Sequence, residues 1–170
     1  TPIVTSEAVL QSSSQLAAGQ MIGIDASSNE PLRQFMLSGS VDNLQQGQYR
    51  VIIGHTLARK LQVSQGDKVR LMVTSASQYS PLGRIPSQRN FTVAGIFNTG
   101  SDVDSQLMVT HIRDAGRMLR MTDQQISGWR LYFDDPFVVE YAKRYDDPNL
   151  PENKWLGIDY DMLFKFVKSE

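Results

Sequence analysis

The sequence predicts a mixed α+β domain in which a sheet is the main element. Apolar residues recur at alternate positions in several short segments, which are separated by Gly, Pro, Asn, Asp and Ser. Short segments with helical spacing lie between them, in the order strands, helix, strands, helix, strand and two helices. The chain has 170 residues, of which 41% are hydrophobic, so it can form one domain or two small ones with a proper core.

The first half predicts strands with one short helix. Helical spacing is clear where Leu57, Ala58 and Leu61 fall on one face. Consecutive apolar residues before Gly54 are typical of a buried strand. The expected elements are strands Ile3–Gln11 and Gln15–Ile24, a short helical turn at Leu32–Leu37, strand Tyr49–Ile53 and helix His55–Leu61.

The second half predicts further strands and three helices. Asp134 and Asp135 before Pro136 are typical of a helix start, because Asp caps a helix and Pro fits its first turn. The expected elements are strands Lys68–Val73, Phe91–Phe97 and Leu107–Val109, an acidic turn at Ser101–Ser105, helix His111–Leu119, strand Ile126–Phe133, helix Phe137–Tyr145, a polar loop at Asp146–Asn153 and helix Asp159–Lys168.

The most unusual stretch is Thr74–Asn90, between two expected strands. A connection of this length without helical or strand periodicity is uncommon in a compact domain, and is often functional. Pro81 and Pro86 restrict its backbone, so it should be stiffer than a Gly/Ser linker. Its apolar side chains favour a protrusion that grips another protein. The alternative is a long hairpin loop folded back on its own domain.

The same region is locally basic. Lys68 to Ser101 contains Lys68, Arg70, Arg84 and Arg89 but no Asp or Glu. Arg70 should face outward, since Val69 and Leu71 beside it face the core, and a hairpin would bring Arg89 close to Arg70. We therefore expect both arginines on one face as an anion-seeking patch, unless each pairs with a carboxylate from elsewhere in the fold.

Composition excludes several functional classes. The net charge of −1 gives no overall basic field for nucleic acid or membranes, and the absence of Cys excludes disulfides and thiolate chemistry. No run of residues approaches a membrane span of about 18–20 apolar residues, and the N-terminus lacks a signal-peptide pattern. If the protein works outside the cytoplasm, we expect this chain to be part of an anchored protein.

No arrangement of residues predicts catalysis or metal binding. His55 and His111 each follow a strand at an expected helix start, where packing or capping is the simpler interpretation. Asp102 and Asp104 lack the remainder of a Ca²⁺-binding loop. Neither a Gly-x-Ser-x-Gly nucleophile motif nor a Gly-rich phosphate loop is present. We therefore expect no catalytic residues, no cofactor and no metal site.

Several segments carry a resemblance to a known family. These are MIGID, VIIG, SASQYSPLGRIPSQR followed by FTVAGIF, and ISGWRLYFDDP. They closely resemble the periplasmic domains of permeases in the lipoprotein-releasing ABC transporters of Gram-negative bacteria, within the MacB-type superfamily. The resemblance covers essentially the whole chain, and its most specific part is the loop, which the paired subunit LolE lacks in this form.

The resemblance implies a two-part organisation. Residues 1–12 and 126–170 would belong to a split Porter-like α/β part, and residues 13–125 to an inserted β-rich Sabre-like part. The family's first Porter strand and helix are expected to be missing from this chain, together with the transmembrane helices.

The resemblance also implies a partner and a binding site. In this family a hairpin loop called the Hook captures the periplasmic lipoprotein carrier LolA, and a neighbouring surface called the Pad supports the contact. The Pad corresponds to Arg70, Gln88 and Arg89. The Hook corresponds to Thr74, Ser75, Ala76, Ser77, Gln78, Tyr79, Ser80, Pro81, Leu82, Gly83, Arg84, Ile85 and Pro86. Thr74 departs from the family pattern, which begins with Pro.

Three functions follow as hypotheses. The first is a docking platform for LolA in a transporter whose other subunits are LolE and the ATPase LolD, with lipoprotein cargo handled indirectly. The second is a MacB-like mechanotransmission domain of an exporter without a dedicated carrier, which would need no stiff apolar loop. The third is a separate small-molecule-binding or hydrolytic domain, which would need a pocket lined by His or paired acids.

Overall fold

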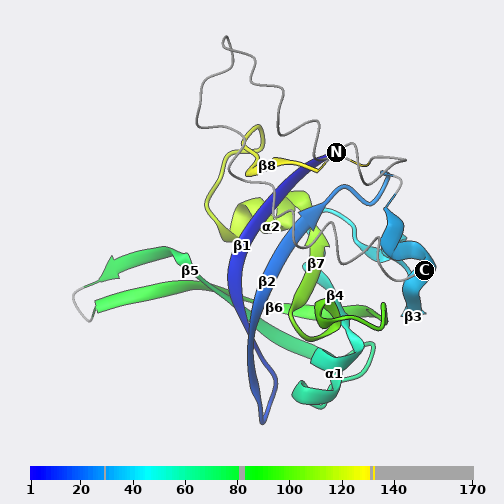
Figure 1. The fold of residues 1–170 in the computed structure, drawn as a ribbon. Helices are drawn as coiled ribbons and strands as arrows, with labels where there is room; N and C mark the ends of the chain where they lie inside the picture. Colours follow the sequence, from blue (N-terminus) through cyan, green and yellow to red (C-terminus); the bar gives the residue numbers. More distant parts are fainter. Residues whose placement is uncertain (29, 81–82, 131, 133–170) are drawn as a thin grey trace, which may run out of the picture.

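The computed structural model describes residues 1–28, 30–80, 83–130 and 132 (Figure 1). Strands dominate, and the helices are short. In chain order the elements are β1 (Pro2–Gln11), β2 (Leu16–Ile24), 3-10 helix η1 (Pro31–Phe35), β3 (Met36–Gly39), 3-10 helix η2 (Val41–Asn43), β4 (Arg50–Gly54), α1 (His55–Leu61), β5 (Lys68–Ser80), β6 (Gly83–Phe97), 3-10 helix η3 (Asp102–Ser105), β7 (Leu107–His111), α2 (Ile112–Met118) and β8 (Gly128–Trp129).

Six strands form a closed ring. Around it, β1 pairs with β2, β2 with β7, β7 with β4, β4 with β6, β6 with β5, and β5 with β1 again. The β2–β7 and β4–β6 pairs are parallel and the other four are antiparallel. β3 is added beside β6, and β8 beside the start of β1. Such closure removes open sheet edges, which otherwise favour aggregation.

One face of the ring encloses an apolar cluster that we call the inner cluster. Alternate residues of each strand supply it, because successive side chains of a strand point to opposite faces. α1 and α2 contribute Leu57, Leu61, Ile112 and Ala115. From the strands it contains Val4, Ala8, Leu10, Ala17, Met21, Val51, Ile53, Val69, Leu71, Val73, Phe91, Val93 and Met108.

The other face of part of the ring is also buried, in what we call the outer cluster. The 3-10 helices cover it with Leu32, Val41 and Val103, which pack with Leu44 and Phe97. The strand residues beneath are Ile22, Ile24, Ile52, Ala94, Leu107 and Val109. Because β4 is buried on both faces, its apolar residues are consecutive, as expected for a buried strand.

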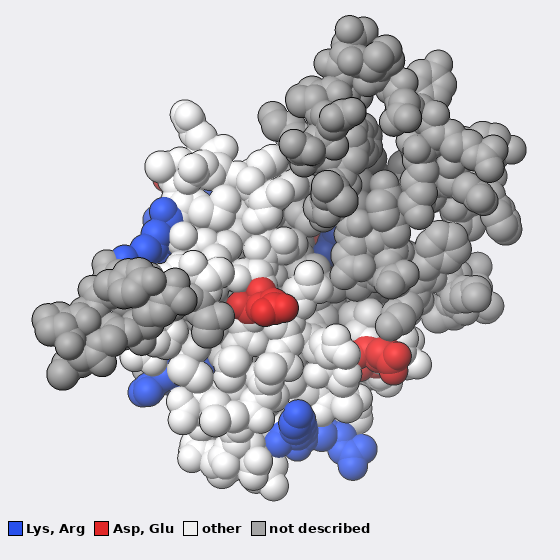
Figure 2. Space-filling view, turned by 60° about the vertical axis from the view of Figure 1, so that its left-hand side comes forward, with Lys and Arg blue, Asp and Glu red and all other residues white. Residues whose placement is uncertain are grey.

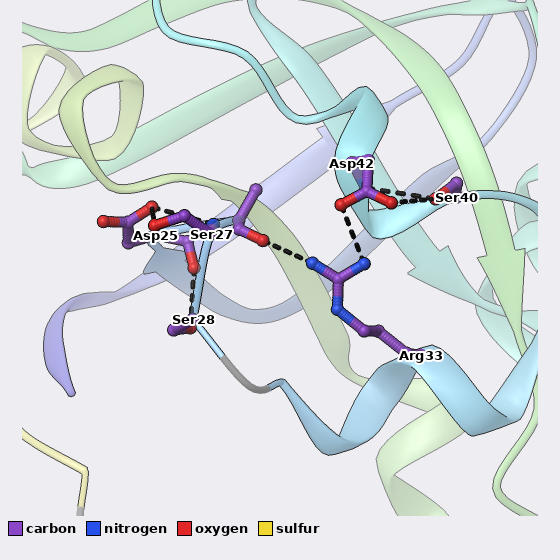
Figure 3. A network of polar contacts seen from close by, with 7 residues as sticks. Asp25, Ser27, Ser28, Arg33, Ser40 and Asp42 are labelled. Atoms are coloured by element: carbon purple, nitrogen blue, oxygen red, sulfur yellow. Dashed lines mark hydrogen bonds and ion pairs between the residues drawn. The ribbon is translucent and has the colours of Figure 1, made fainter.

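The turns over the outer cluster are held by polar contacts (Figure 3). Arg33 of η1 donates to Asp42 Oδ1 of η2 at 2.8 Å and also to the carbonyl of Ala26. Asp25 accepts from the backbone N–H and the hydroxyl of Ser27 at 2.9 and 2.7 Å. These contacts join the loop after β2 to η1, and η1 to η2.

Most expected elements are confirmed. α1 has the expected bounds, and β1 and β2 agree with them to within one residue. The helical turn at Leu32–Leu37 is instead η1 followed by β3, a strand that the sequence did not predict. The strand expected at Ile126–Phe133 has only Gly128–Trp129 among its described residues.

The remaining expectations fall on the C-terminal segment. Helices Phe137–Tyr145 and Asp159–Lys168, with the loop Asp146–Asn153, lie outside the described residues. The division into Porter-like and Sabre-like parts stays a prediction. Among the described residues, none of the helices has the length and apolar composition of a membrane span.

Candidate functional site

The stretch expected to protrude is a long β-hairpin. β5 and β6 pair from Lys68↔Thr92 to Val73↔Ser87, and again from Gln78↔Ile85 to Ser80↔Gly83. The expectation that Thr74–Asn90 has no regular structure is therefore wrong, since the strands continue almost to its end. Figure 1 shows the two strands leaving the body of the molecule together.

The hairpin contains a large bulge at its middle. Residues 74–77 of β5 lie opposite a single residue of β6, Pro86. Proline lacks the N–H that a regular ladder needs, so the pairing is interrupted where Pro86 stands. Irregular pairing conceals strand periodicity, which explains why the sequence indicated a loop.

Only the base of the hairpin is part of the ring. β1 pairs with β5 through Arg70, Leu71 and Met72, and β4 pairs with β6 from Thr92 onward. Beyond the ring, the hydroxyls of Ser6 and Ser75 lie 3.0 Å apart. The segment from Thr74 to Pro86 thus extends from a support that is fixed on both sides. Pro81 and Leu82 lie outside the described residues, as do the side chains of Tyr79 and Ile85.

The three predicted Pad residues are exposed and lie at this base, but on two different faces. Arg70 is opposite Asn90, Leu71 opposite Arg89, and Met72 opposite Gln88. Residues opposite each other point to the same face, so Gln88 shares a face with Arg70 while Arg89 shares the face of Leu71. The expectation that Arg70 and Arg89 occupy one face is therefore wrong.

The bulge is the physical reason why Arg70 and Arg89 lie on different faces. A regular hairpin continuing from Ser80↔Gly83 would place Arg70 opposite Val93, and Arg89 would then share its face. The bulge adds three residues to β5 relative to β6. Because side chains alternate with a period of two, an odd number of extra residues reverses the facing.

Arg89 rests on an aromatic platform that the sequence did not indicate. Its guanidinium carbon lies 4.1 Å from the centre of the Tyr49 ring. The Tyr49 ring meets Phe91 edge-on, with centroids 5.6 Å apart. Tyr49 was expected only to begin a strand; it lies just before β4, with a left-handed φ of 48°. No sequence signal identified it, since Asn and Gly are the usual residues in that conformation.

A buried carboxylate holds the turn before β4. Asp114 of α2 is fully buried and accepts from the backbone N–H groups of Gly47 at 2.7 Å and Tyr49 at 3.0 Å. Arg117, on the next turn of α2, lies 3.7 Å from the same carboxylate.

Charge is sparse on the side from which the hairpin projects. In Figure 2 most described side chains there are uncharged, with a few basic groups and isolated acidic ones. No acid occurs in β5 or β6. The basic residues at the base therefore belong to a surface that is mostly uncharged (Figure 2).

Two of the other titratable candidates, His111 and Asp104, have structural roles. His111 caps α2, its Nδ1 accepting from the Arg113 N–H at 3.1 Å. Asp104 is buried and accepts from the backbone N–H groups of Thr99 and Gly100, at 2.9 Å each. Across the described ranges, no three His, Cys, Asp or Glu residues lie close enough together to hold a metal ion.

Comparisons with known proteins give relatives and a family. A domain of a putative permease protein from Porphyromonas gingivalis is 18% identical, with a TM-score of 0.40, covering 87% of this chain and 63% of that one. The lipoprotein-releasing system transmembrane protein LolC of Haemophilus influenzae is 40% identical over 139 residues, which is 81% of this chain and 35% of that protein. LolC of Neisseria meningitidis serogroup B is 34% identical, over 79% of this chain and 33% of that protein.

This chain thus spans about a third of the length of these LolC proteins. The profile of the MacB-like periplasmic core domain matches residues 1–144, which is most of the chain. The resemblance to the MacB-type superfamily expected from the sequence motifs is confirmed, and the chain belongs to the family of MacB-like periplasmic core domains.

Proposed function

We propose that this chain is the periplasmic domain of a LolC-type permease in the inner membrane, and that its hairpin docks the lipoprotein carrier LolA. The single observation that supports this best is the β5–β6 hairpin, a ribbon that leaves the closed ring with an apolar tip sequence and basic residues at its base. The relatives named LolC suggest the transport system to which such a docking element would belong.

The tip and the base of the hairpin have different roles in this proposal. Tyr79, Pro81, Leu82 and Ile85 enter an apolar recess of the carrier and act as anchors, since buried aromatic and apolar side chains dominate binding energy. Support from the ring and the two prolines reduces the conformational entropy that binding would otherwise cost.

At the base, Arg70 and Gln88 bind the carrier on one face of the hairpin, and Arg89 binds it on the other. The carrier therefore contacts the base on both sides, rather than resting on a single patch. Carboxylates on the carrier pair with the two arginines, which aids encounter and register more than affinity.

In the proposed transporter this domain performs no catalysis and holds no cofactor. ATP hydrolysis belongs to the LolD subunit, and LolE is the paired permease. Lipoproteins extracted from the inner membrane pass to the docked LolA. The alternative, a MacB-like mechanotransmission domain, fits the same fold but gives no purpose to an apolar protruding hairpin.

Calorimetry of this domain with LolA from the same bacterium tests the proposal. We expect binding by the intact domain, and loss of binding when Tyr79–Ile85 is replaced by Gly/Ser residues of equal number. The control is Leu37→Ser, because Leu37 is 59% exposed on β3 and lies outside the hairpin. Equal binding by the intact and replaced forms would contradict the docking role, and no binding by the intact domain would favour mechanotransmission.

A further inference from the structure

We propose that Tyr49 and Asp114 are positioning residues of the docking surface: Asp114 fixes the turn that carries Tyr49, and the Tyr49 ring holds the Arg89 guanidinium ready for a carboxylate of the carrier. The inference rests on the proposed function for the identity of that partner. The positioning itself is a property of this chain and can be measured without any partner.

The Arg89 guanidinium lies over the Tyr49 ring. The guanidinium carbon is 4.1 Å from the ring centre, well within the range at which a cation is attracted to an aromatic face. Arg89 is exposed, and an exposed arginine normally samples many rotamers. The Tyr49 ring beneath the guanidinium favours those Arg89 rotamers that lie on the same face of the hairpin as Leu71.

The Tyr49 ring is itself held in place by a neighbouring ring. Phe91, which is 1% exposed in the inner cluster, meets it edge-on at an interplanar angle of 87°. Arg117 of α2 lies near this tyrosine, and the interaction with Tyr49 holds the pKa of the Arg117 guanidinium above its ordinary value. The ring is therefore held against the core by Phe91 on one side, and the Arg89 guanidinium lies over its face.

The backbone that carries the Tyr49 ring is held by Asp114. Tyr49 has φ 48° and Gly47 has φ 80°, both in the left-handed region that residues other than Gly rarely adopt. Both oxygens of Asp114 are used to hold this turn, Oδ1 by the Gly47 N–H and Oδ2 by the Tyr49 N–H. Asp114 is fully buried in α2, beside Ala115 of the inner cluster. The position of Arg89 is thus set by a helix on the far side of the turn.

The expected consequence is a lower entropic cost of docking. A free arginine must be ordered when it binds a carboxylate, whereas one already resting on a ring loses less freedom. Loss of the ring should weaken carrier binding by about threefold to tenfold, the effect of ordering one long side chain. Loss of Arg89 should weaken it further, because the charge is lost as well.

A double-mutant cycle tests this with LolA binding as the readout. The variants are Tyr49→Leu, Arg89→Ala and the pair together. If Tyr49 acts through Arg89, the pair binds no more weakly than Arg89→Ala alone. Tyr49→Phe is the conservative control, because it keeps the ring, and should bind within about twofold of the unchanged domain. If the double variant lost affinity by the product of the two single effects, the proposal would be overturned. Unchanged binding by Tyr49→Leu would overturn it as well.

Nuclear magnetic resonance provides the partner-free test. A ring at this distance shifts the Arg89 side-chain resonances upfield. The shift should vanish in Tyr49→Leu, persist in Tyr49→Phe and decrease in Asp114→Asn, which keeps one acceptor oxygen. An Arg89 without this shift in the unchanged domain would overturn the positioning. A shifted Arg89 in a domain that does not bind LolA would instead count against the proposed function.

Discussion

Glu30 is a carboxylate that folding removes from water, with 5% of its surface exposed. Arg130 donates to both of its oxygens, at 3.1 and 2.9 Å, and the Tyr132 hydroxyl lies 3.3 Å from one of them. The pair joins the loop before η1 to the segment after β8. Because both charges are largely desolvated, losing one partner leaves the other buried and unpaired.

We therefore expect Arg130→Met to lower the free energy of unfolding by about 3–5 kcal/mol. Asp42→Asn is the matched control, since the Arg33–Asp42 pair is exposed, with 69% of the Asp42 side chain accessible. Exposed pairs contribute about 1 kcal/mol or less. Urea unfolding followed by circular dichroism measures both, and similar losses for the two variants would contradict the difference in burial.

We expect His111 to make the stability of the domain depend on pH. Burial lowers the pKa of its imidazole below the ordinary value of 6.5, against the opposing attraction of Asp114 and Asp25. The unfolded chain therefore takes up a proton at a higher pH than the folded protein does. The contribution of the neutral cap is fully present above about pH 6.5, and is lost as the pH falls below it.

Thermal unfolding between pH 8 and pH 5 should show this decline. His111→Asn can still cap α2 through its side-chain oxygen but does not titrate in this range, so its decline should be smaller. An equal slope in the two proteins would show that another group causes the decline. His55→Asn controls for the second histidine.

At the scale of elements, we expect the ring to determine stability and the hairpin to determine binding. The pairs that close the ring lie in residues 68–73 of β5 and 87–97 of β6, so the ring keeps all of these pairs when residues 74–86 are removed. Replacing them with a short Asn-Gly turn should change the free energy of unfolding by no more than about 1 kcal/mol, the worth of one exposed hydrogen bond such as Ser6–Ser75. The same variant should no longer bind LolA.

A denaturant titration and calorimetry on one sample measure both properties. Retained stability with lost binding would separate docking from folding. A loss of several kcal/mol would mean instead that the hairpin belongs to the core of the domain.

Elements with local periodicity could be predicted from the sequence, and α1 is the clearest case. Leu57, Ala58 and Leu61 show helical spacing, and its bounds are as expected. The faces of Arg70 and Arg89 could not be predicted, because they depend on three extra residues opposite Pro86. Tyr49 was missed for a related reason: its role depends on Asp114, 65 residues later in the chain.

At the scale of the whole molecule, closure of the ring depends on pairings that no local pattern reveals. β2 pairs in parallel with β7, which lies more than 80 residues further along the chain. The sequence indicated strands and a mixed α+β class, but the partner of each strand is determined by tertiary packing. One result of this packing is that β4 is buried on both faces, with Ile52 in the outer cluster and Ile53 in the inner cluster.

If the two clusters are independent, the effects of trimming them should add. Ile52 and Ile53 are both fully buried, and each substitution to Val should cost about 0.5–1.5 kcal/mol. The double variant should equal the sum of the single variants within about 0.5 kcal/mol, because the two side chains point to opposite faces and lie in different clusters. Urea unfolding measures all three, with the exposed Leu37→Ala as a control expected to change stability by less than about 0.5 kcal/mol. A double variant that departs from the sum would show that the sheet couples the two clusters, so that a change on one face of the ring alters packing on the other.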